Sequence, residues 1–237
     1  MSRLRLFPLN AVLFPGAVLN LHVFEPRYKQ LIAECLDGGE AFGVCLIRDG
    51  EEAGDSEVDP HEVGTTAEIA DVTPLPFGRF AISTQGRRRF RIQGVVSREP
   101  YLLCDVEYLD DESETETAES EALSDQVRRD FREYLRLLSE YAGTGSEVEV
   151  PSDAARASFV IGDALQVADP VKQRLLEISS PQQRLRVELD FLKRLLPQLR
   201  SLLERRRGTP SAPREQPQGG AARSEQERYF GKYFSAN

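Results

Sequence analysis

Few residues in this sequence have the types and spacing that catalysis or metal binding requires. Its two histidines, His22 and His61, lie far apart and cannot form a paired-histidine zinc motif. Its three cysteines, Cys35, Cys45 and Cys104, are odd in number and widely spaced, which argues against a disulfide framework or a zinc knuckle. No phosphate-binding glycine loop or nucleophile elbow occurs in the 237 residues. We therefore predict no catalytic residues, no metal and no cofactor, in a reducing, cytoplasmic setting.

One concentrated basic feature runs from Arg87 to Arg91 and is interrupted only by Phe90. On a strand, Arg87, Arg89 and Arg91 share a face, which is either a nucleic-acid patch or a solvated face with one arginine paired to a carboxylate. Residues 1–110 contain 11 basic and 17 acidic residues, and the whole chain carries a formal charge of −9. Because phosphate binding depends on summed positive charge, the composition favours the solvated face and argues against nucleic acid as a partner.

The elements that position these residues change character near residue 112. Before that point, short alternating segments are separated by Pro, Gly and Asp, and one helix with Pro26 in its first turn runs to Gly38. Short turns between successive strands favour a closed or folded-over barrel over a parallel α/β sheet. The predicted strands are Leu4–Phe7, Val18–Val23, Phe42–Arg48, Thr65–Val72, Arg79–Thr84, Arg88–Val96 and Leu102–Tyr108.

The acidic segment Asp110–Glu116 has no apolar residue to bury, so we expect a solvated linker there. Beyond it, apolar residues recur with helical spacing, and Asp-Pro or Ser-Pro pairs mark helix starts. Pro197 is expected to kink the last of four predicted helices. The sequence therefore predicts an α+β protein with a β subdomain at 1–112, a helical bundle at 117–205, a flexible linker at 206–223 and an aromatic tail at 224–237. No apolar run reaches the roughly 18 residues of a membrane-spanning helix.

An ordered set of short motifs resembles the Lon N-terminal (substrate-binding) domain family. Single pieces are weak, but their order across residues 4–108 is specific. The motifs are Leu6-Phe7-Pro8-Leu9, Val12-Leu13-Phe14-Pro15-Gly16, Val23-Phe24-Glu25-Pro26-Arg27-Tyr28, Phe42-Gly43-Val44, Val63–Ile69, Gly78-Arg79, Gly86, Arg89-Phe90 and Pro100-Tyr101.

That resemblance implies a PUA-like β pseudo-barrel followed by a helical bundle, which recognises unfolded or tagged protein substrates. The sequence contains no Walker motif, and we expect no ATPase or Ser-Lys peptidase domain such as full-length Lon proteases carry. A "peptidase S16" label would thus describe the relatives' chemistry. We expect a stand-alone, non-enzymatic protein- or peptide-binding module, an adaptor or regulator of proteolysis. RNA binding through the PUA-like barrel and an unrecognised hydrolase are the alternatives.

Aromatic residues beside prolines in the first half are candidates for an apolar peptide groove. For each ring alone, ordinary barrel core is the competing interpretation. The charged residues Glu25 and Arg27 either orient a peptide or form an internal pair that fixes the turn before the first helix. The candidate peptide-binding residues are Phe7, Phe14, Phe24, Glu25, Arg27, Tyr28 and Phe77.

The aromatic tail begins with Ser224-Glu225-Gln226-Glu227, which fits a helix capping box. Three interpretations compete: docking onto its own domain, insertion into a neighbouring molecule, or a disordered tail. Because such a short helix is unstable alone, we predict that it docks in a protein groove, with self-association as one form of this. The candidate docking residues are Tyr229, Phe230, Tyr233 and Phe234.

Overall fold

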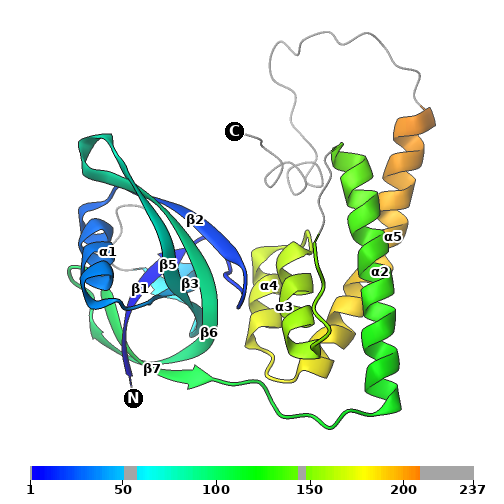
Figure 1. The fold of residues 1–237 in the computed structure, drawn as a ribbon, viewed down its shortest axis with the longest axis horizontal. Helices are drawn as coiled ribbons and strands as arrows, with labels where there is room; N and C mark the ends of the chain where they lie inside the picture. The colour runs from blue at the N-terminus through cyan, green and yellow to red at the C-terminus, as the bar shows by residue number, and fades with distance from the viewer. Residues whose placement is uncertain (1, 51–57, 144–147, 209–237) are drawn as a thin grey trace.

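A computed structural model of the chain describes residues 2–50, 58–143 and 148–208. It places a β-barrel beside a helical bundle, and an extended segment after the last strand joins the two (Figure 1). The predicted α+β class, with strands first and helices second, is confirmed. The predicted tail at 224–237 and most of the predicted linker at 206–223 lie outside the described residues.

The strands of the described sheet close into a barrel. β1 to β3 is a parallel pairing, with Leu6 opposite Gly43, while the other neighbours are antiparallel. The sheet order is β1-β7-β6-β5-β3-β4, and β2 pairs with β6 outside this path. The strands are β1 (Ser2–Leu9), β2 (Val18–Val23), β3 (Phe42–Asp49), β4 (Asp59–Pro60), β5 (Val63–Leu75), β6 (Arg79–Ser97) and β7 (Leu102–Leu109).

β6 is one long strand, where the sequence predicted two strands with a break near Gly86. Gly86 continues the strand, and its carbonyl oxygen accepts a hydrogen bond from the Gly16 backbone N–H at 2.8 Å. A Cβ at Gly86 would lie 2.2 Å from the carbonyl oxygen of Phe14. The glycine is therefore needed for close approach of the loop before β2, and it does not end the strand.

The helix α1 (Pro26–Gly38), which the sequence predicted, covers part of the barrel. Pro26 occupies its first turn, and Gly39 ends it in the left-handed conformation with φ of 61°. Its buried residues Leu31 and Ile32 pack into a barrel core that also contains Phe42 and Val44.

The bundle consists of α2 (Ala118–Ala142), α3 (Ala154–Ala164), α4 (Asp169–Glu177) and α5 (Pro181–Gly208). The long helices α2 and α5 lie side by side (Figure 1), and α5 continues through Pro197 as one helix. Apolar residues at helical spacing along α5, from Leu185 to Leu203, are buried in the bundle core.

One aromatic ring joins the barrel to the bundle. Phe14 lies in the loop before β2, yet it is fully buried in the core of the bundle. A Cβ at Gly162 of α3 would lie 3.1 Å from the Phe14 ring, so α3 packs closely against it. The two subdomains therefore share part of a single hydrophobic core.

Candidate functional site

Two aromatic side chains, Phe24 and Phe77, are exposed at one end of the barrel. Phe24 follows β2 and is 53% exposed, whereas Phe77 is 91% exposed in η1 (Pro76–Gly78), the turn between β5 and β6. The same end of β6 pairs with β2, with Phe80 opposite Val23. We call Phe24 and Phe77 the aromatic edge. Exposed apolar side chains that form a contiguous patch mark interaction sites, whereas single ones are common on protein surfaces.

The backbone of Phe77 adopts the left-handed conformation, with φ of 65° and ψ of 30°. Gly78 also has a positive φ of 65°. Glycine tolerates this region, but a bulky side chain pays a steric cost there. Strained residues that persist in this way tend to lie at functional sites, which makes the exposed ring of Phe77 a candidate contact residue.

Two cations border the aromatic edge. A Cβ at Gly78 would lie 4.0 Å from the Lys29 ammonium, so the turn lies beside α1. The Arg79 guanidinium lies 5.8 Å from the centre of the Phe77 ring, and its Nε donates to the Pro76 carbonyl oxygen at 3.0 Å. Within residues 2–50, 58–143 and 148–208, neither cation has a carboxylate partner. The edge therefore suits an apolar group with a carboxylate nearby.

Several predicted peptide-binding aromatics lie inside the protein. Phe7 and Tyr28 stack in the barrel core with ring centres 3.8 Å apart, and Phe14 lies in the shared core. All three side chains are buried. Burial favours the core interpretation because each ring gains more from packing than from exposure on a polar surface. Of the aromatic residues predicted for the groove, Phe24 and Phe77 are the exposed ones.

Glu25 and Arg27 form the internal pair that the sequence offered as an alternative. The Arg27 Nε donates to the Glu25 carboxylate at 3.0 Å, and its guanidinium lies 4.5 Å from the centre of the Tyr28 ring. These contacts fix the turn between β2 and α1. They therefore position Phe24, which directly precedes Glu25.

A buried ion cluster joins barrel, linker and bundle. Arg184 of α5 is fully buried and makes two hydrogen bonds of 2.8 Å to the Asp111 carboxylate, while its Nε donates to Ser158. Arg89 of β6 donates to the same carboxylate at 2.6 Å and to the Leu176 carbonyl oxygen at 2.7 Å. Burial lowers the pKa of Arg89, and Asp111 opposes that shift. Bidentate, desolvated contacts of this kind hold the two subdomains in one orientation.

Glu188, one turn after Arg184, is another buried ionisable residue at this junction. It is fully buried, and among the described residues neither carboxylate oxygen has a hydrogen-bond partner. It lies near Gly162, whose Cβ would be 3.4 Å from one of these oxygens. Burial raises the pKa of Glu188 well above its ordinary value, and Arg184 only partly offsets this.

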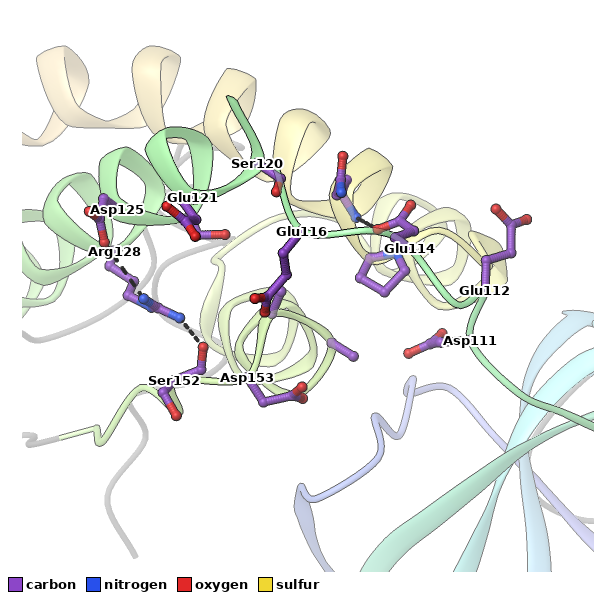
Figure 2. Close-up of a pocket in the computed structure, with 15 residues that line it drawn as sticks. Asp111, Glu112, Glu114, Glu116, Ser120, Glu121, Asp125, Arg128, Ser152 and Asp153 are labelled. Carbon is purple, nitrogen blue, oxygen red and sulfur yellow. Dashed lines mark hydrogen bonds and ion pairs between the residues drawn. The ribbon is translucent and has the colours of Figure 1, made fainter. Parts of the chain in front are cut away.

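Carboxylates also surround a pocket of about 440 Å³ where the linker meets the bundle (Figure 2). Several of them cap helices: Asp153 accepts from the Arg156 backbone N–H at 2.8 Å, and Glu114 accepts from the Gln182 backbone N–H at 3.0 Å. Glu112 accepts from the Ser179 hydroxyl at 2.6 Å. Glu112 is exposed, as expected of a solvated linker. Glu114 is partly buried where it caps α5, because helix N-termini attract carboxylates.

The arginine run is mostly engaged within the protein. Arg87 pairs with Glu68, and Arg88 pairs with Asp110 at 3.1 Å, while Arg89 is buried. The sequence favoured a solvated face with one arginine paired to a carboxylate. In the structure three of these arginines are paired with carboxylates, and one of the three, Arg89, is buried.

The groups with catalytic potential are dispersed. Cys35, Cys45 and Cys104 are buried free thiols, and burial raises the pKa of Cys35 and of Cys104 to about 11. The described residues contain no group of three His, Cys, Asp or Glu side chains placed to hold a metal. Nor do they include a helix whose length and apolar character would let it span a membrane.

The sequence analysis did not identify the buried residues Arg184 and Glu188 at the junction, nor the two cations at the aromatic edge. A signal for Arg184 and Glu188 existed, because they are four residues apart and adjoin the apolar positions Leu185 and Leu189. No sequence signal places Lys29 beside the η1 turn, since that contact depends on how β5 and β6 fold over α1.

Comparison with known proteins gives consistent matches. A family model described as "ATP-dependent protease La (LON) substrate-binding domain" matches residues 3–194. Lon protease 2 of Myxococcus xanthus is 30% identical over 193 residues, which cover 81% of this chain and 23% of that protein. Lon protease of Anaeromyxobacter dehalogenans is 29% identical over the same length and coverage. This chain thus spans less than a quarter of the length of these relatives.

Solved structures resemble the fold over most of the chain. The Lon N-terminal domain protein from Xanthomonas campestris is 30% identical with a TM-score of 0.61, covering 80% of this chain and 98% of that one. The N-terminal domain of the Mycobacterium avium complex Lon protease has a TM-score of 0.58, covering 81% of this chain and 98% of that one. At 18% identity, the second comparison concerns the fold alone.

Proposed function

Because this chain belongs to the family of ATP-dependent protease La (LON) substrate-binding domains, we propose that it binds unfolded polypeptide segments through the aromatic edge, Phe24 and Phe77. The family itself supports a substrate-recognition module, and the match covers that module without the catalytic domains of the relatives. The geometry adds a location for the contact. Unfolded chains differ from folded ones in exposing apolar side chains, which the aromatic edge can bury.

The proposal depends above all on the exposure and the backbone conformation of Phe77. Its ring is 91% exposed while its backbone is held at a positive φ. Neither property stabilises the folded chain, since exposure forgoes burial and the left-handed conformation costs free energy. Binding accounts for both, because a protruding ring fits between the side chains of a partner.

We further propose that the protein is a non-enzymatic adaptor or regulator of proteolysis in the cytoplasm. The dispersed histidines and the buried thiols with raised pKa values support a role without chemistry of its own. Purified protein that hydrolysed casein or small esters without added ATP would contradict this assignment. Nucleic acid is not our proposed ligand, because Arg87 and Arg88 are paired and Arg89 is buried.

The aromatic tail provides a second part of the proposal. Tyr229, Phe230, Tyr233 and Phe234 present the apolar character that the aromatic edge should bind, either in the same chain or in a neighbouring molecule. Deletion of residues 209–237 is expected to change oligomeric state or partner binding. Unchanged stability, oligomeric state and binding after the deletion would contradict a docking role for the tail.

Fluorescence anisotropy of fluorescein-labelled β-casein, a largely unfolded protein, tests the proposed function. We expect Phe77→Asn to weaken casein binding at least fivefold while leaving stability unchanged or slightly higher, since Asn tolerates a positive φ. Val95→Ser is the matched control, because Val95 is an exposed apolar residue (49%) near the other end of β6. Wild-type protein that does not bind casein, or equal losses for the two variants, would contradict the proposal.

A further inference from the structure

The strand β2 leaves one of its two edges open. It hydrogen-bonds with β6 on one side, with Val18 opposite Gln85 and Val23 opposite Phe80. No other strand of the described sheet pairs with it. It leads directly into Phe24, so its open edge is continuous with the aromatic edge.

The backbone groups that face the open edge can be identified from the ladder. The Ala17 carbonyl oxygen accepts from the Gly86 backbone N–H at 2.9 Å, which shows that Ala17 faces β6. Because backbone groups alternate sides along an antiparallel strand, the odd-numbered residues Leu19, Leu21 and Val23 also face β6. The residues that face outward are therefore Val18, Asn20 and His22, each with one donor and one acceptor.

This edge lacks the features that usually protect an exposed strand. Natural edge strands carry Lys, Pro, charged side chains or bulges that prevent pairing with another chain. β2 contains no Pro, Lys, Arg, Asp or Glu, and its register with β6 is continuous. The side chains of Val18, Asn20 and His22 are all exposed, so none of them folds into the barrel.

We propose that β2 binds an extended segment of an unfolded polypeptide as an added antiparallel or parallel strand. The inference rests on the proposed function and specifies how the same site holds its ligand. Main-chain hydrogen bonds to Val18, Asn20 and His22 are independent of the ligand's sequence, which suits recognition of many unfolded chains.

Side-chain contacts then set the preference among segments. A segment paired along β2 extends past Val23 to Phe24, where an apolar side chain packs on the aromatic edge. Lys29 and Arg79 lie beside that edge without carboxylate partners among the described residues. Charge complementarity therefore favours segments in which an acidic residue lies near an apolar one.

A proline at an outward-facing position tests the added strand. Asn20→Pro removes an N–H that points away from β6, so it blocks strand addition and leaves the β2–β6 ladder intact. With fluorescein-labelled β-casein as the probe, we expect at least tenfold weaker binding for Asn20→Pro. The matched variant Asn20→Ala keeps the N–H and should bind within twofold of wild type. Equal binding by Asn20→Pro and wild type would overturn the proposal.

Hydrogen exchange on the wild-type protein provides a test that needs no variant. The amides of Val18, Asn20 and His22 should exchange rapidly in free protein and at least tenfold more slowly in the saturated casein complex. If casein binds and Phe77→Asn weakens binding, but these amides stay unprotected, then strand addition at β2 is refuted and binding at the aromatic edge is retained. If wild-type protein does not bind casein, both proposals are wrong.

Discussion

At the scale of single residues, burial changes the protonation of the Glu188 carboxyl group. Its carboxylate is fully buried without a hydrogen-bond partner among the described residues, and burial raises its pKa well above the ordinary value. Arg184 is the charged group that acts on it, and the aromatic ring of Phe14 packs nearby against Gly162. A carboxyl group in this setting keeps its proton to higher pH than in the unfolded chain.

The raised pKa determines the sign of a pH dependence. In the unfolded chain Glu188 loses its proton near pH 4.5, whereas in the folded protein it keeps the proton to higher pH. Its contribution to stability is thus fully present below that value and is lost as pH rises towards the folded-state pKa. Glu188→Gln removes the titration and keeps the shape. We expect its stability advantage over wild type to grow from pH 4 to pH 8.

Urea unfolding of both proteins at pH 4, 6 and 8 measures this difference. A constant difference between the two proteins across that range would show that Glu188 does not titrate as its burial indicates. The exposed Glu204→Gln, on the same helix, is the control and should leave the pH dependence unchanged.

At the scale of elements, the fold depends on one close approach between β6 and the loop that carries Phe14. A Cβ at Gly86 would lie 2.2 Å from the Phe14 carbonyl oxygen, whereas a Cβ at Gly94 on the same strand meets nothing within 4 Å. Gly86→Ala must therefore displace this loop, and with it the ring that joins barrel and bundle.

We expect Gly86→Ala to lower the free energy of unfolding by about 3 kcal/mol, in the upper range for single substitutions. Gly94→Ala should change it by less than about 1 kcal/mol, since both positions lie on β6 and only one is crowded. Thermal and urea denaturation measure both values. A similar loss of unfolding free energy in the two variants would contradict this expectation. It would mean that the effect comes from replacing glycine in the strand and not from the contact with Phe14.

Most elements were predictable from the sequence because their signals are local. Pro26 and Gly39 mark α1, and the spacing of leucines from Leu185 to Leu203 marks α5. The length of β6 was not predictable, because Gly86 resembles a strand break unless the position of Phe14 is known. Exposed Phe77 and buried Phe7 were indistinguishable in the sequence, since both are phenylalanines beside a proline. Only the tertiary fold separates them.

At the scale of the whole molecule, we expect the barrel and the bundle to behave as one unit. Phe14 inserts into the bundle core, and Asp111 of the linker binds Arg89 from the barrel and Arg184 from the bundle. Such a rigid frame keeps the aromatic edge in a fixed place relative to the helices. The linker itself is part of that frame, since its Glu114 carboxylate caps α5 of the bundle.

Removal of the central arginine should therefore affect the whole protein. Arg184→Ala leaves a cavity and one fewer partner for the Asp111 carboxylate, for which we expect a loss of about 3–5 kcal/mol. Arg136→Ala removes contacts of 3.5 Å and 4.0 Å that an exposed arginine makes to two glutamates, and it should cost less than about 1 kcal/mol. Urea unfolding followed by circular dichroism measures both. Equal small losses would contradict a junction held by the buried ion cluster.

The claim that the aromatic edge binds unfolded polypeptide is tested most directly by site-specific photo-crosslinking. A benzophenone amino acid replaces Phe77 in one variant and Val95 in the other, and each is irradiated with unfolded β-casein. We expect a covalent casein adduct from position 77, reduced by excess unlabelled casein, and little or none from position 95. Equal adducts from the two positions, or an adduct from position 95 alone, would contradict it.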